Sequence, residues 1–314
     1  MKNYFFTSKI LLFGEYVILE NYSGLSIPNH FYTGYLKFPS VFRYYNNKQF
    51  NYTNHELRKF AFFLKKTRIN IDFNKLYNDL NKGIIFSSNI PKGYGIGSSG
   101  ALVAAIYHKY YIAPQPQQQK GQLSMNNIIA LKQIFSQMES YFHGISSGMD
   151  PLICYLNKPI LIKSKNDITI VNLPKKLNQN IGKGAIFLLN SGFPKRTYSM
   201  IKIFFNKLQN TQFKKIFIKE FIQYNNKCIV SFLQGNFKIL FHNIKIISFW
   251  ILKYLNTMIP KQILKIWKYG LLNNIFYLKL CGSGGGGFTI GFTYDYDLSK
   301  KKLKKYQTIV IFRF

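Results

Sequence analysis

Residues 91–101 combine three glycines at alternate positions with a pair of serines, directly before an apolar run that begins at Ala101. Glycine allows the tight backbone conformations of a loop and lets a ligand approach the main chain. The free N–H groups at the start of the following helix, together with the helix dipole, form a site for an anion. A serine hydroxyl there can cap the helix or bind a metal ion. The stretch therefore predicts a phosphate-binding loop.

The same stretch differs from two common phosphate-binding motifs. No Lys-Ser or Lys-Thr pair closes the loop, as a Walker P-loop requires. The spacing of the glycines and the downstream acidic residues also differ from the dinucleotide-binding fingerprint. A surface turn is the simpler alternative, but the combination of loop, serine pair and apolar helix favours the anion site.

A second group of chemically capable residues extends from Glu139 to Asp150, around a turn rich in glycine and serine over residues 143–148. Ser136, Glu139 and His143 would share one face of a helix. A solvated helix glutamate and an ordinary turn aspartate are the alternatives. The chain has only 11 acidic residues. Two of them beside glycine and serine therefore predict a metal ligand or a general base.

Two further stretches flank these groups. Residues 8–20 begin as a buried strand, with Lys9 just before the apolar run and a break at residues 14–15. Residues 284–287 are four consecutive glycines between strand-like flanks, whereas a linker would be polar on both sides. Such a loop lets the backbone pass close to a phosphate or close over a site. Cys281 is expected to be a buried apolar residue rather than a nucleophile, because no helper residue is apparent.

The composition indicates a globular protein. The 314 residues are enough for one large or two ordinary domains, and a hydrophobic content of 47% supports a sizeable core. The three widely spaced cysteines form neither a metal-ligand pair nor a disulfide framework, which fits a reducing cytoplasm. Lys9 and Glu15 interrupt the first apolar run, which argues against a signal peptide. We expect no membrane span, because no run of about 18 uncharged apolar residues exists.

A net charge of +32 is the most conspicuous bulk property. It is typical of a protein that binds nucleic acid or a membrane surface. Lysine is, however, spread along the whole chain, and Lys, Asn, Ile, Phe and Tyr, which all have AT-rich codons, are all abundant. Compositional drift explains the charge and the aromatic content together, so we expect no specific nucleic-acid partner. A positive field would still attract anionic substrates.

The pattern of apolar residues predicts alternating strands and helices, with a domain boundary that separates residues 1–175 from residues 176–314. A biased segment over residues 114–122 is expected to be a mobile surface connection. The expected strands are short antiparallel strands within 21–50, then 69–73, 83–88, 160–162, 168–171, 185–189 and 308–312. The expected helices are 57–67, 98–112, 125–143, 198–208, 212–233, 236–257, 263–273 and 298–306.

Three blocks in this order resemble the GHMP kinases, the superfamily of galactokinase, homoserine kinase, mevalonate kinase and phosphomevalonate kinase. The blocks are residues 9–15, 91–101 and 282–287. The spacing from Glu139 to Asp150 and a basic turn over residues 194–197 are most similar to those of mevalonate kinases. Together the blocks span nearly the whole chain.

The resemblance implies an α+β fold, with an N-terminal domain like domain 2 of ribosomal protein S5 and a ferredoxin-like C-terminal α/β sandwich. It implies an enzyme that uses ATP and Mg²⁺ to phosphorylate the primary hydroxyl of mevalonate, giving 5-phosphomevalonate for isoprenoid biosynthesis in the cytoplasm. The resemblance leaves a homodimer open.

The resemblance also implies roles for individual residues. Asp150 would take the proton from the substrate hydroxyl, and Lys9 would stabilise the negative charge that develops there. Ser99 and Glu139 would hold Mg²⁺. The implied cofactor-binding residues are Gly93, Gly95, Gly97, Ser98, Ser99, Gly100 and Ala101. The implied substrate-binding residues are Glu15, Tyr16, His143, Gly144, Arg196, Thr197, Gly284 and Gly285.

Two positions depart from the pattern. Tyr16 stands where mevalonate kinases usually carry histidine, which leaves the acceptor open. Gly100 stands where alanine is usual, and glycine weakens a helix start by about 0.5–1 kcal/mol.

The alternatives within the family are a phosphomevalonate kinase, a sugar kinase and diphosphomevalonate decarboxylase. Lys9 and the spacing of the two acidic residues argue against the decarboxylase. The alternative from another class is a noncatalytic protein that binds small molecules or nucleic acid. Loss of Lys9, Glu139 or Asp150 would indicate such a protein, and all three are present.

Overall fold

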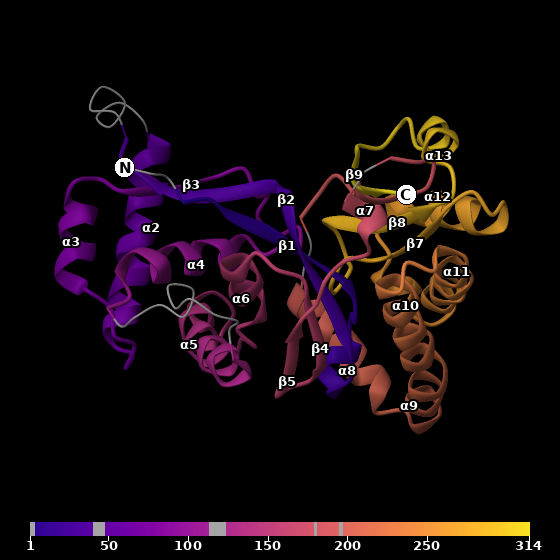
Figure 1. Ribbon diagram of the computed structural model, residues 1–314, viewed down its shortest axis with the longest axis horizontal. Helices are drawn as coiled ribbons and strands as arrows, with labels where there is room; N and C mark the ends of the chain where they lie inside the picture. Colours follow the sequence, from indigo (N-terminus) through magenta and orange to yellow (C-terminus); the bar gives the residue numbers. More distant parts are fainter. Residues whose placement is uncertain (1–3, 40–47, 113–123, 179–180, 195–196) are drawn as a thin grey trace. The chain divides into compact units, whose positions relative to one another are not determined.

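The structure is a computed structural model that describes the chain except for residues 1–3, 40–47, 113–123, 179–180 and 195–196 (Figure 1). The connection expected over residues 114–122 lies outside the described residues. The chain forms two compact units. Unit 1 consists of Met1–Lys9, Pro28–Pro91 and Gly97–Lys158, and unit 2 of Ile10–Ile27, Lys92–Ile96 and Pro159–Phe314.

The predicted single boundary after residue 175 differs from this division. Strands β1 (Phe6–Phe13) and β2 (Gly24–Lys37) each contribute residues to both units, so no single cut of the chain separates them. The division of the chain into family domains at this boundary stays a prediction.

Unit 1 is built from helices packed beside antiparallel strands. Its core includes the rings of Tyr107, Phe135 and Tyr155, which meet edge to face with centroids 4.9, 5.2 and 5.5 Å apart. These rings join three helices of the unit. The elements are α2 (Lys48–Lys65), α3 (Phe73–Asn81), β3 (Ile85–Ser88), α4 (Ser98–Tyr110), α5 (Met125–His143) and α6 (Met149–Leu156).

Several predicted elements in this region are confirmed and others are wrong. Helix α5 begins and ends as predicted, with the Ser124 side chain accepting from the Asn127 N–H at its start. The strand predicted over 69–73 is an isolated bridge at Ile71, because Asp72 caps α3. The described residues of 21–50 hold one 14-residue strand, β2, rather than several short ones, and α2 begins before residue 50.

The first sheet has the strand order β1-β2-β4-β5, and β3 also pairs with β2. The pairs β2–β3, β2–β4 and β4–β5 are antiparallel. Strands β4 (Ile160–Ser164) and β5 (Asp167–Ile170) match two predicted strands. A 3-10 helix, η1 (Val17–Glu20), connects β1 to β2.

The second sheet lies wholly in unit 2 and has the order β7-β8-β6-β9, with every pair antiparallel. Its strands are β6 (Ala185–Asn190), β7 (Tyr277–Leu280), β8 (Phe288–Thr293) and β9 (Thr308–Arg313). Along the chain, β6 is followed by a set of helices, then by β7 and β8, then by a helix and finally by β9. This order is the ferredoxin-like arrangement that was predicted, and the α+β fold class is confirmed.

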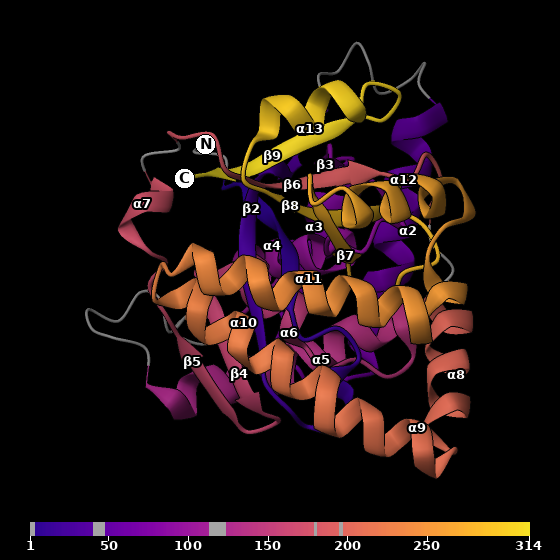
Figure 2. The same cartoon turned by 90° about the vertical axis from the view of Figure 1, so that its right-hand side faces the viewer.

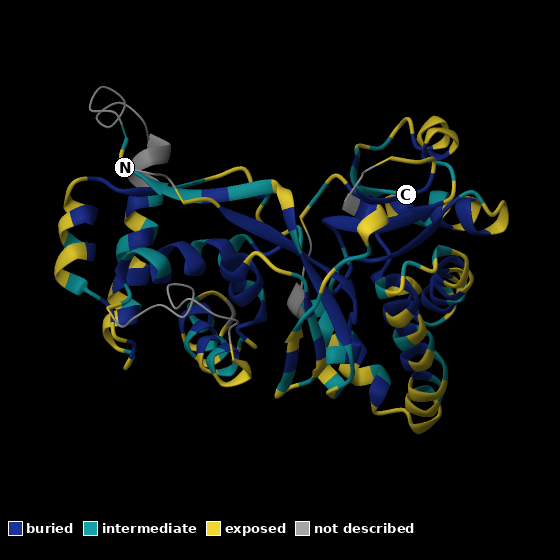
Figure 3. Cartoon of the chain, viewed as in Figure 1, coloured by how far each residue is buried: buried dark blue, intermediate teal, exposed yellow. Residues whose placement is uncertain are grey.

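Helices α10 and α11 lie side by side in unit 2 (Figure 2). Every residue of β7 and β8 is buried (Figure 3). The helical elements of unit 2 are α7 (Lys175–Asn178), α8 (Thr197–Leu208), α9 (Thr211–Ile216), the π-helix η3 (Phe217–Ile222), α10 (Gln223–Leu233), α11 (Phe237–Tyr254), the 3-10 helix η4 (Asn256–Met258), α12 (Lys261–Leu272) and α13 (Tyr296–Lys302).

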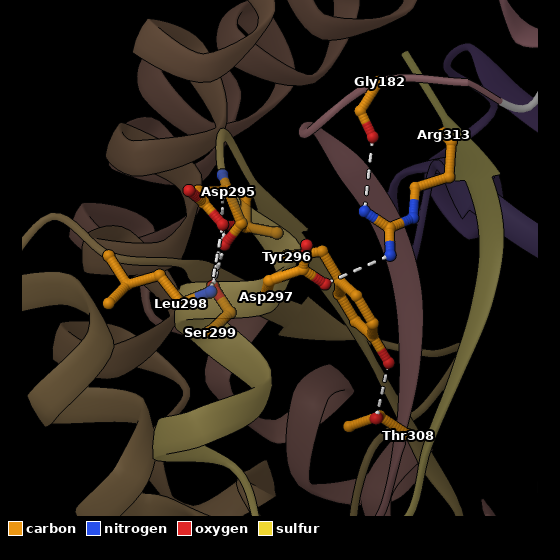
Figure 4. Close-up of polar contacts among 9 residues, drawn as sticks. Gly182, Asp295, Tyr296, Asp297, Leu298, Ser299, Thr308 and Arg313 are labelled. Carbon is orange, nitrogen blue, oxygen red and sulfur yellow. Dashed lines mark hydrogen bonds and ion pairs between the residues drawn. The ribbon is translucent and has the colours of Figure 1, made fainter.

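Polar contacts connect α13 to the last strand (Figure 4). The side chain of Asp295 caps α13. The hydroxyl of Tyr296 lies 2.7 Å from that of Thr308 in β9, and the Arg313 guanidinium lies 3.5 Å from the Asp297 carboxylate. These contacts hold the edge strand of the second sheet against the helix.

All three cysteines are buried outside any disulfide, so the expectation that Cys281 is a buried residue is confirmed. Within the described part of the chain, no helix combines the length and the apolar character needed to cross a membrane.

Candidate active site

Unit 1 brings the predicted catalytic pair together. The Nζ atom of Lys9 lies 2.9 Å from Oδ1 of Asp150. The side chain of Lys9, within β1, is 8% exposed, whereas that of Asp150 is 36% exposed. The ammonium is therefore fixed inside the unit, and the carboxylate it holds remains accessible to a solute.

Helix α6, which the sequence did not predict, positions Asp150. Pro151 sits in its first turn, where the missing N–H of proline costs nothing. The helix begins after Gly148, and a Cβ there would lie 2.2 Å from the carbonyl oxygen of Lys132 in α5. Helix α6 thus starts directly against the backbone of α5. Asp150 lies in the first turn, where the helix dipole stabilises a carboxylate.

Glu139 of α5 is the second predicted acidic group, and its residue is only 3% exposed. One carboxylate oxygen accepts from the Ser99 hydroxyl at 3.1 Å, and the other accepts from the Ser146 hydroxyl. Burial, followed by the charge of Asp150, raises the pKa of Glu139 to about 7, although both serine hydrogen bonds and Lys9 oppose the shift. A cation beside this carboxyl would favour its ionised form.

Two glycines let helix α4 approach these groups. A Cβ at Gly97 would lie 2.9 Å from Cγ of Lys9. A Cβ at Gly100 would lie 2.8 Å from the carbonyl carbon of Asp150 and 2.9 Å from the nitrogen of Pro151. The departure at position 100 therefore has a packing reason, because the start of α6 occupies the space that a methyl group would need.

The predicted phosphate loop has the backbone that its glycines suggest. Gly93, Gly95 and Gly97 have φ values of +79°, +77° and +79°, a region that glycine adopts without steric cost. Gly97 caps helix α4 without a side-chain hydrogen bond, so neither Ser98 nor Ser99 acts as the helix cap. The hydroxyl of Ser99 instead donates to Glu139, as a residue at a metal site would be placed.

Ala101, a predicted cofactor-binding residue, is packed inside unit 1. Its methyl group is fully buried, and its N–H donates to the carbonyl of Gly97 at 3.0 Å. Both groups that it could offer to a cofactor are thus used within the helix.

Glu15, a predicted substrate-binding residue, is buried in unit 2. This side chain is 1% exposed in unit 2, and its Oε2 lies 2.8 Å from Nζ of Lys279, which is also 1% exposed. Burial raises the pKa of Glu15, and the charge of Lys279 opposes the shift. The turn after β1 directs Glu15 into the core of unit 2, and its contact with a substrate stays a prediction.

Tyr16 contacts the glycine-rich loop over residues 282–287, which we call the GSGGGG loop. Its hydroxyl donates to the carbonyl of Ser283, and its ring stacks on Phe204 of α8 at 4.2 Å. Burial raises the pKa of the Tyr16 hydroxyl, and the charge of Glu15 adds to the shift. The phenol is therefore a neutral donor at ordinary pH.

The GSGGGG loop is tightly packed within unit 2. A Cβ at Gly284 would lie 2.6 Å from the carbonyl oxygen of Met258, and one at Gly285 would lie 2.7 Å from Cγ of Met200. A Cβ at Gly287 would lie 2.7 Å from Cα of Tyr94. The loop and residues 92–96 therefore lie against each other, and the glycines permit this approach.

Four predicted substrate-binding residues remain, His143, Gly144, Arg196 and Thr197. Gly144 ends α5 with a φ of +73°, as predicted. Arg196 lies outside the described residues, as do the side chains of His143 and Thr197. Their roles stay predictions.

Sequence reasoning missed Ser146 and Lys279. Ser146 supplies the second hydrogen bond to Glu139, and its place in the turn beside Gly148 was the available signal. Lys279 is a charged residue within an otherwise apolar strand, which is itself a signal that a buried partner exists.

The donor set fits a magnesium ion better than a transition metal. Among the described residues, no group of three or more His, Cys, Asp or Glu side chains could hold a metal. Mg²⁺ prefers oxygen ligands, keeps several waters and usually takes one or two carboxylates in a phosphate site. The buried Glu139 carboxylate and the Ser99 hydroxyl suit those requirements.

Comparisons with known proteins give a family match for part of the chain and similar folds for nearly all of it. Residues 63–158 match the family described as GHMP kinases N terminal domain. The mevalonate kinase of Methanococcus jannaschii is 17% identical over 100% of this chain and 98% of its own, with a TM-score of 0.62. The phosphomevalonate kinase of Streptococcus pneumoniae, solved with phosphomevalonate and AMPPNP, is 14% identical over 99% of this chain and 100% of its own, with a TM-score of 0.59. The galactokinase of Lactococcus lactis, complexed with galactose, is 12% identical over 99% of this chain and 93% of its own, with a TM-score of 0.58. No curated protein matches the sequence.

Residues 63–158 thus match the N-terminal domain of the GHMP kinases, and the fold is similar to that of solved kinases of this superfamily. Members of this family are generally small-molecule kinases that use ATP. At identities of 12–17%, the likeness to the solved structures shows the fold and leaves the acceptor undecided.

Gly100→Ala tests the packing of α4 against the start of α6. In an open helix this exchange adds about 1 kcal/mol of stability. Here the methyl group meets the backbone of Asp150, so we expect no gain in the free energy of unfolding and at least a tenfold loss of kinase turnover. Urea denaturation and an ADP-release assay measure the two quantities.

Gly235→Ala is the matched control, because Gly235 has a φ of +69° and belongs to unit 2, whereas Gly100 and Asp150 belong to unit 1. It should lose stability through backbone strain and keep its turnover. A Gly100→Ala variant that is more stable and fully active would contradict the packing argument.

Proposed function

We propose that this chain transfers the γ-phosphoryl group of ATP to the primary hydroxyl of mevalonate, giving 5-phosphomevalonate. The observation that carries the proposal is the Lys9–Asp150 ion pair, electrostatically coupled to the buried Glu139 in a GHMP kinase fold. The spacing from Glu139 to Asp150 supports mevalonate as the acceptor, since it is most similar to that of mevalonate kinases.

Asp150 is the proposed general base. An alcohol is a poor nucleophile until its proton leaves, and a positioned base contributes about 10²–10⁴-fold to the rate. Asp150 accepts the proton as the acceptor oxygen bonds to phosphorus and the bond to the leaving ADP oxygen breaks. Its partial exposure suits contact with a substrate.

Lys9 has two proposed effects. Its ammonium, 2.9 Å from Asp150, orients the aspartate, and it offers a positive charge to the acceptor oxygen as negative charge develops there. Its burial restricts the ammonium to one place, so little reorganisation is needed during the reaction.

Ser99 and Glu139 are the proposed magnesium ligands, and the loop over residues 93–99 is the proposed phosphate cradle. Bound Mg²⁺ neutralises charge on the phosphates of ATP, which is the main requirement of phosphoryl transfer. Ser146 holds the Glu139 carboxylate from its other side and so fixes its orientation.

An ADP-release assay with mevalonate, phosphomevalonate, galactose and homoserine tests the acceptor. We expect the highest kcat/KM with mevalonate. Turnover confined to another alcohol would refute the mevalonate assignment. This outcome is worth testing because Tyr16 stands where mevalonate kinases usually carry histidine. No turnover with any acceptor, together with tight nucleic-acid binding at physiological salt, would favour the noncatalytic alternative.

Asp150→Asn tests the base assignment. The amide keeps the size of the side chain but cannot accept the proton, so we expect turnover to fall by about 10²–10⁴-fold. ATP affinity, measured by calorimetry, should stay close to that of the wild type. Asp167→Asn is the control, because it removes a carboxylate from an exposed ion pair in β5. A near-normal rate for Asp150→Asn would refute the assignment.

Glu139→Gln tests the metal site. The neutral amide binds Mg²⁺ more weakly, so the Mg²⁺ concentration for half-maximal rate should rise at least tenfold, and Ser99→Ala should shift it in the same direction. Glu56→Gln, which removes the carboxylate of an exposed ion pair with Lys59, serves as the control. An unchanged Mg²⁺ dependence in Glu139→Gln would exclude this carboxylate as a ligand.

A further inference from the structure

The ion pair of Glu15 and Lys279 is the most deeply buried of those in the described residues, and the proposed chemistry does not use it. Lys279 also donates to the carbonyl of Leu280 at 3.0 Å. The ammonium of Lys279 lies 2.8 Å from Oε2 of Glu15, so the two charges attract each other at short range.

Stability alone is a weak explanation for such a pair. Removing two charges from water is expensive, and apolar residues of similar volume often replace a buried ion pair without loss. Removing one partner is different, because it leaves an unpaired charge in the core. This pair is unusual in its position. Glu15 lies in the turn at residues 14–16, and Lys279 lies in the strand that precedes the GSGGGG loop.

Glu15 orients a strained turn. Gly14, just before it, has a φ of +112°, and a Cβ there would lie 2.6 Å from Cα of Gly24. Tyr16, just after it, has a φ of +64°, which is uncommon for a bulky residue and disfavoured by about 1–2 kcal/mol. A conformation of this kind persists only where surrounding contacts hold it. The buried ion pair is such a contact.

Lys279, the other partner of the ion pair, is placed next to the GSGGGG loop. It lies in β7, directly before the GSGGGG loop, and its strand neighbours are all buried. The loop is tied down further along by two backbone bonds, from Gly285 N–H to Met258 at 2.7 Å and from Gly287 N–H to Phe193 at 2.8 Å. Earlier in the loop, the carbonyl of Ser283 accepts from the Tyr16 hydroxyl.

We infer that the Glu15–Lys279 pair is a positioning device for the GSGGGG loop. It holds the turn at residues 14–16 against β7, so that the Tyr16 hydroxyl fixes the loop backbone at Ser283. Both charged residues act through Tyr16 and need not contact a substrate. The effect on catalysis rests on the proposed function, together with the predicted contact of Gly284 and Gly285 with the substrate.

Hydrogen exchange of peptides that cover residues 282–287 tests the inference without any turnover. Glu15→Gln and Tyr16→Phe should each speed exchange of the loop amides at least tenfold. The double variant should exchange no faster than the faster single variant, because the two residues act in series. Tyr16→Phe leaves both charges paired, so it decides the question if Glu15→Gln does not fold.

Asp79→Asn is the matched control, since it breaks an ion pair with Lys109 at 2.9 Å in unit 1. It should lower the free energy of unfolding and leave exchange of the GSGGGG loop at the wild-type rate. Unchanged loop exchange in Tyr16→Phe would overturn the inference. Equal acceleration in Asp79→Asn would overturn it as well, because it would reduce the effect to a general loss of stability.

Kinetics separates this inference from the proposed function. Glu15→Gln and Tyr16→Phe should raise the KM for the acceptor at least fivefold and change kcat less, because the loop positions the substrate and takes no proton. A wild-type protein without kinase activity, but with the expected exchange pattern, would refute the proposed function and leave the positioning role intact. Altered kcat with unchanged KM and unchanged exchange would refute the positioning role.

Discussion

The structure of unit 1 depends on one constraint, which is that the buried ammonium of Lys9 must have a partner. An unpaired charge at 8% exposure would be strongly unfavourable, and the carboxylate of Asp150 at 2.9 Å supplies the opposite charge. The start of α6 must therefore lie close to β1, and α4 can pass beside them only because Gly97 and Gly100 lack side chains. The close approach that satisfies a buried charge also creates an oriented, accessible carboxylate.

The few acidic residues of the chain are also used where a charge or a helix start needs a partner. The chain has 43 lysines and arginines against 11 acidic residues, so most cations have no carboxylate nearby. Many of the acids that remain have a definite physical task. Two cap helices, several pair with lysines, and two form the candidate site. The excess positive charge would favour the approach of polyphosphates and other anions.

Local signals made part of the molecule predictable. The glycines at 93, 95 and 97 require unusual φ values, and Ser124 caps α5, so these features could be predicted from short stretches of sequence. Features that depend on distant contacts could not. The π-helix η3 and the left-handed Tyr16 have no local signature, and the inward position of Glu15 depends on Lys279, more than 250 residues away. Helices α3 and α6 had local start signals, Asp72 and Pro151, but neither helix was predicted. The apolar pattern over residues 69–73 favoured a strand at the start of α3, and the glycine- and serine-rich stretch favoured a turn at the start of α6.

The account rests on transfer of a phosphoryl group to a carbon-bound hydroxyl, rather than on ATP binding or hydrolysis. A phosphorus NMR time course of the wild-type protein with ATP, Mg²⁺ and mevalonate distinguishes these outcomes directly. The account predicts that the γ-phosphate signal of ATP decays while ADP and a phosphomonoester signal, coupled to the protons of the primary carbon of mevalonate, grow in equal amounts. Loss of ATP with inorganic phosphate as the only other product, or no loss of ATP at all, would contradict it.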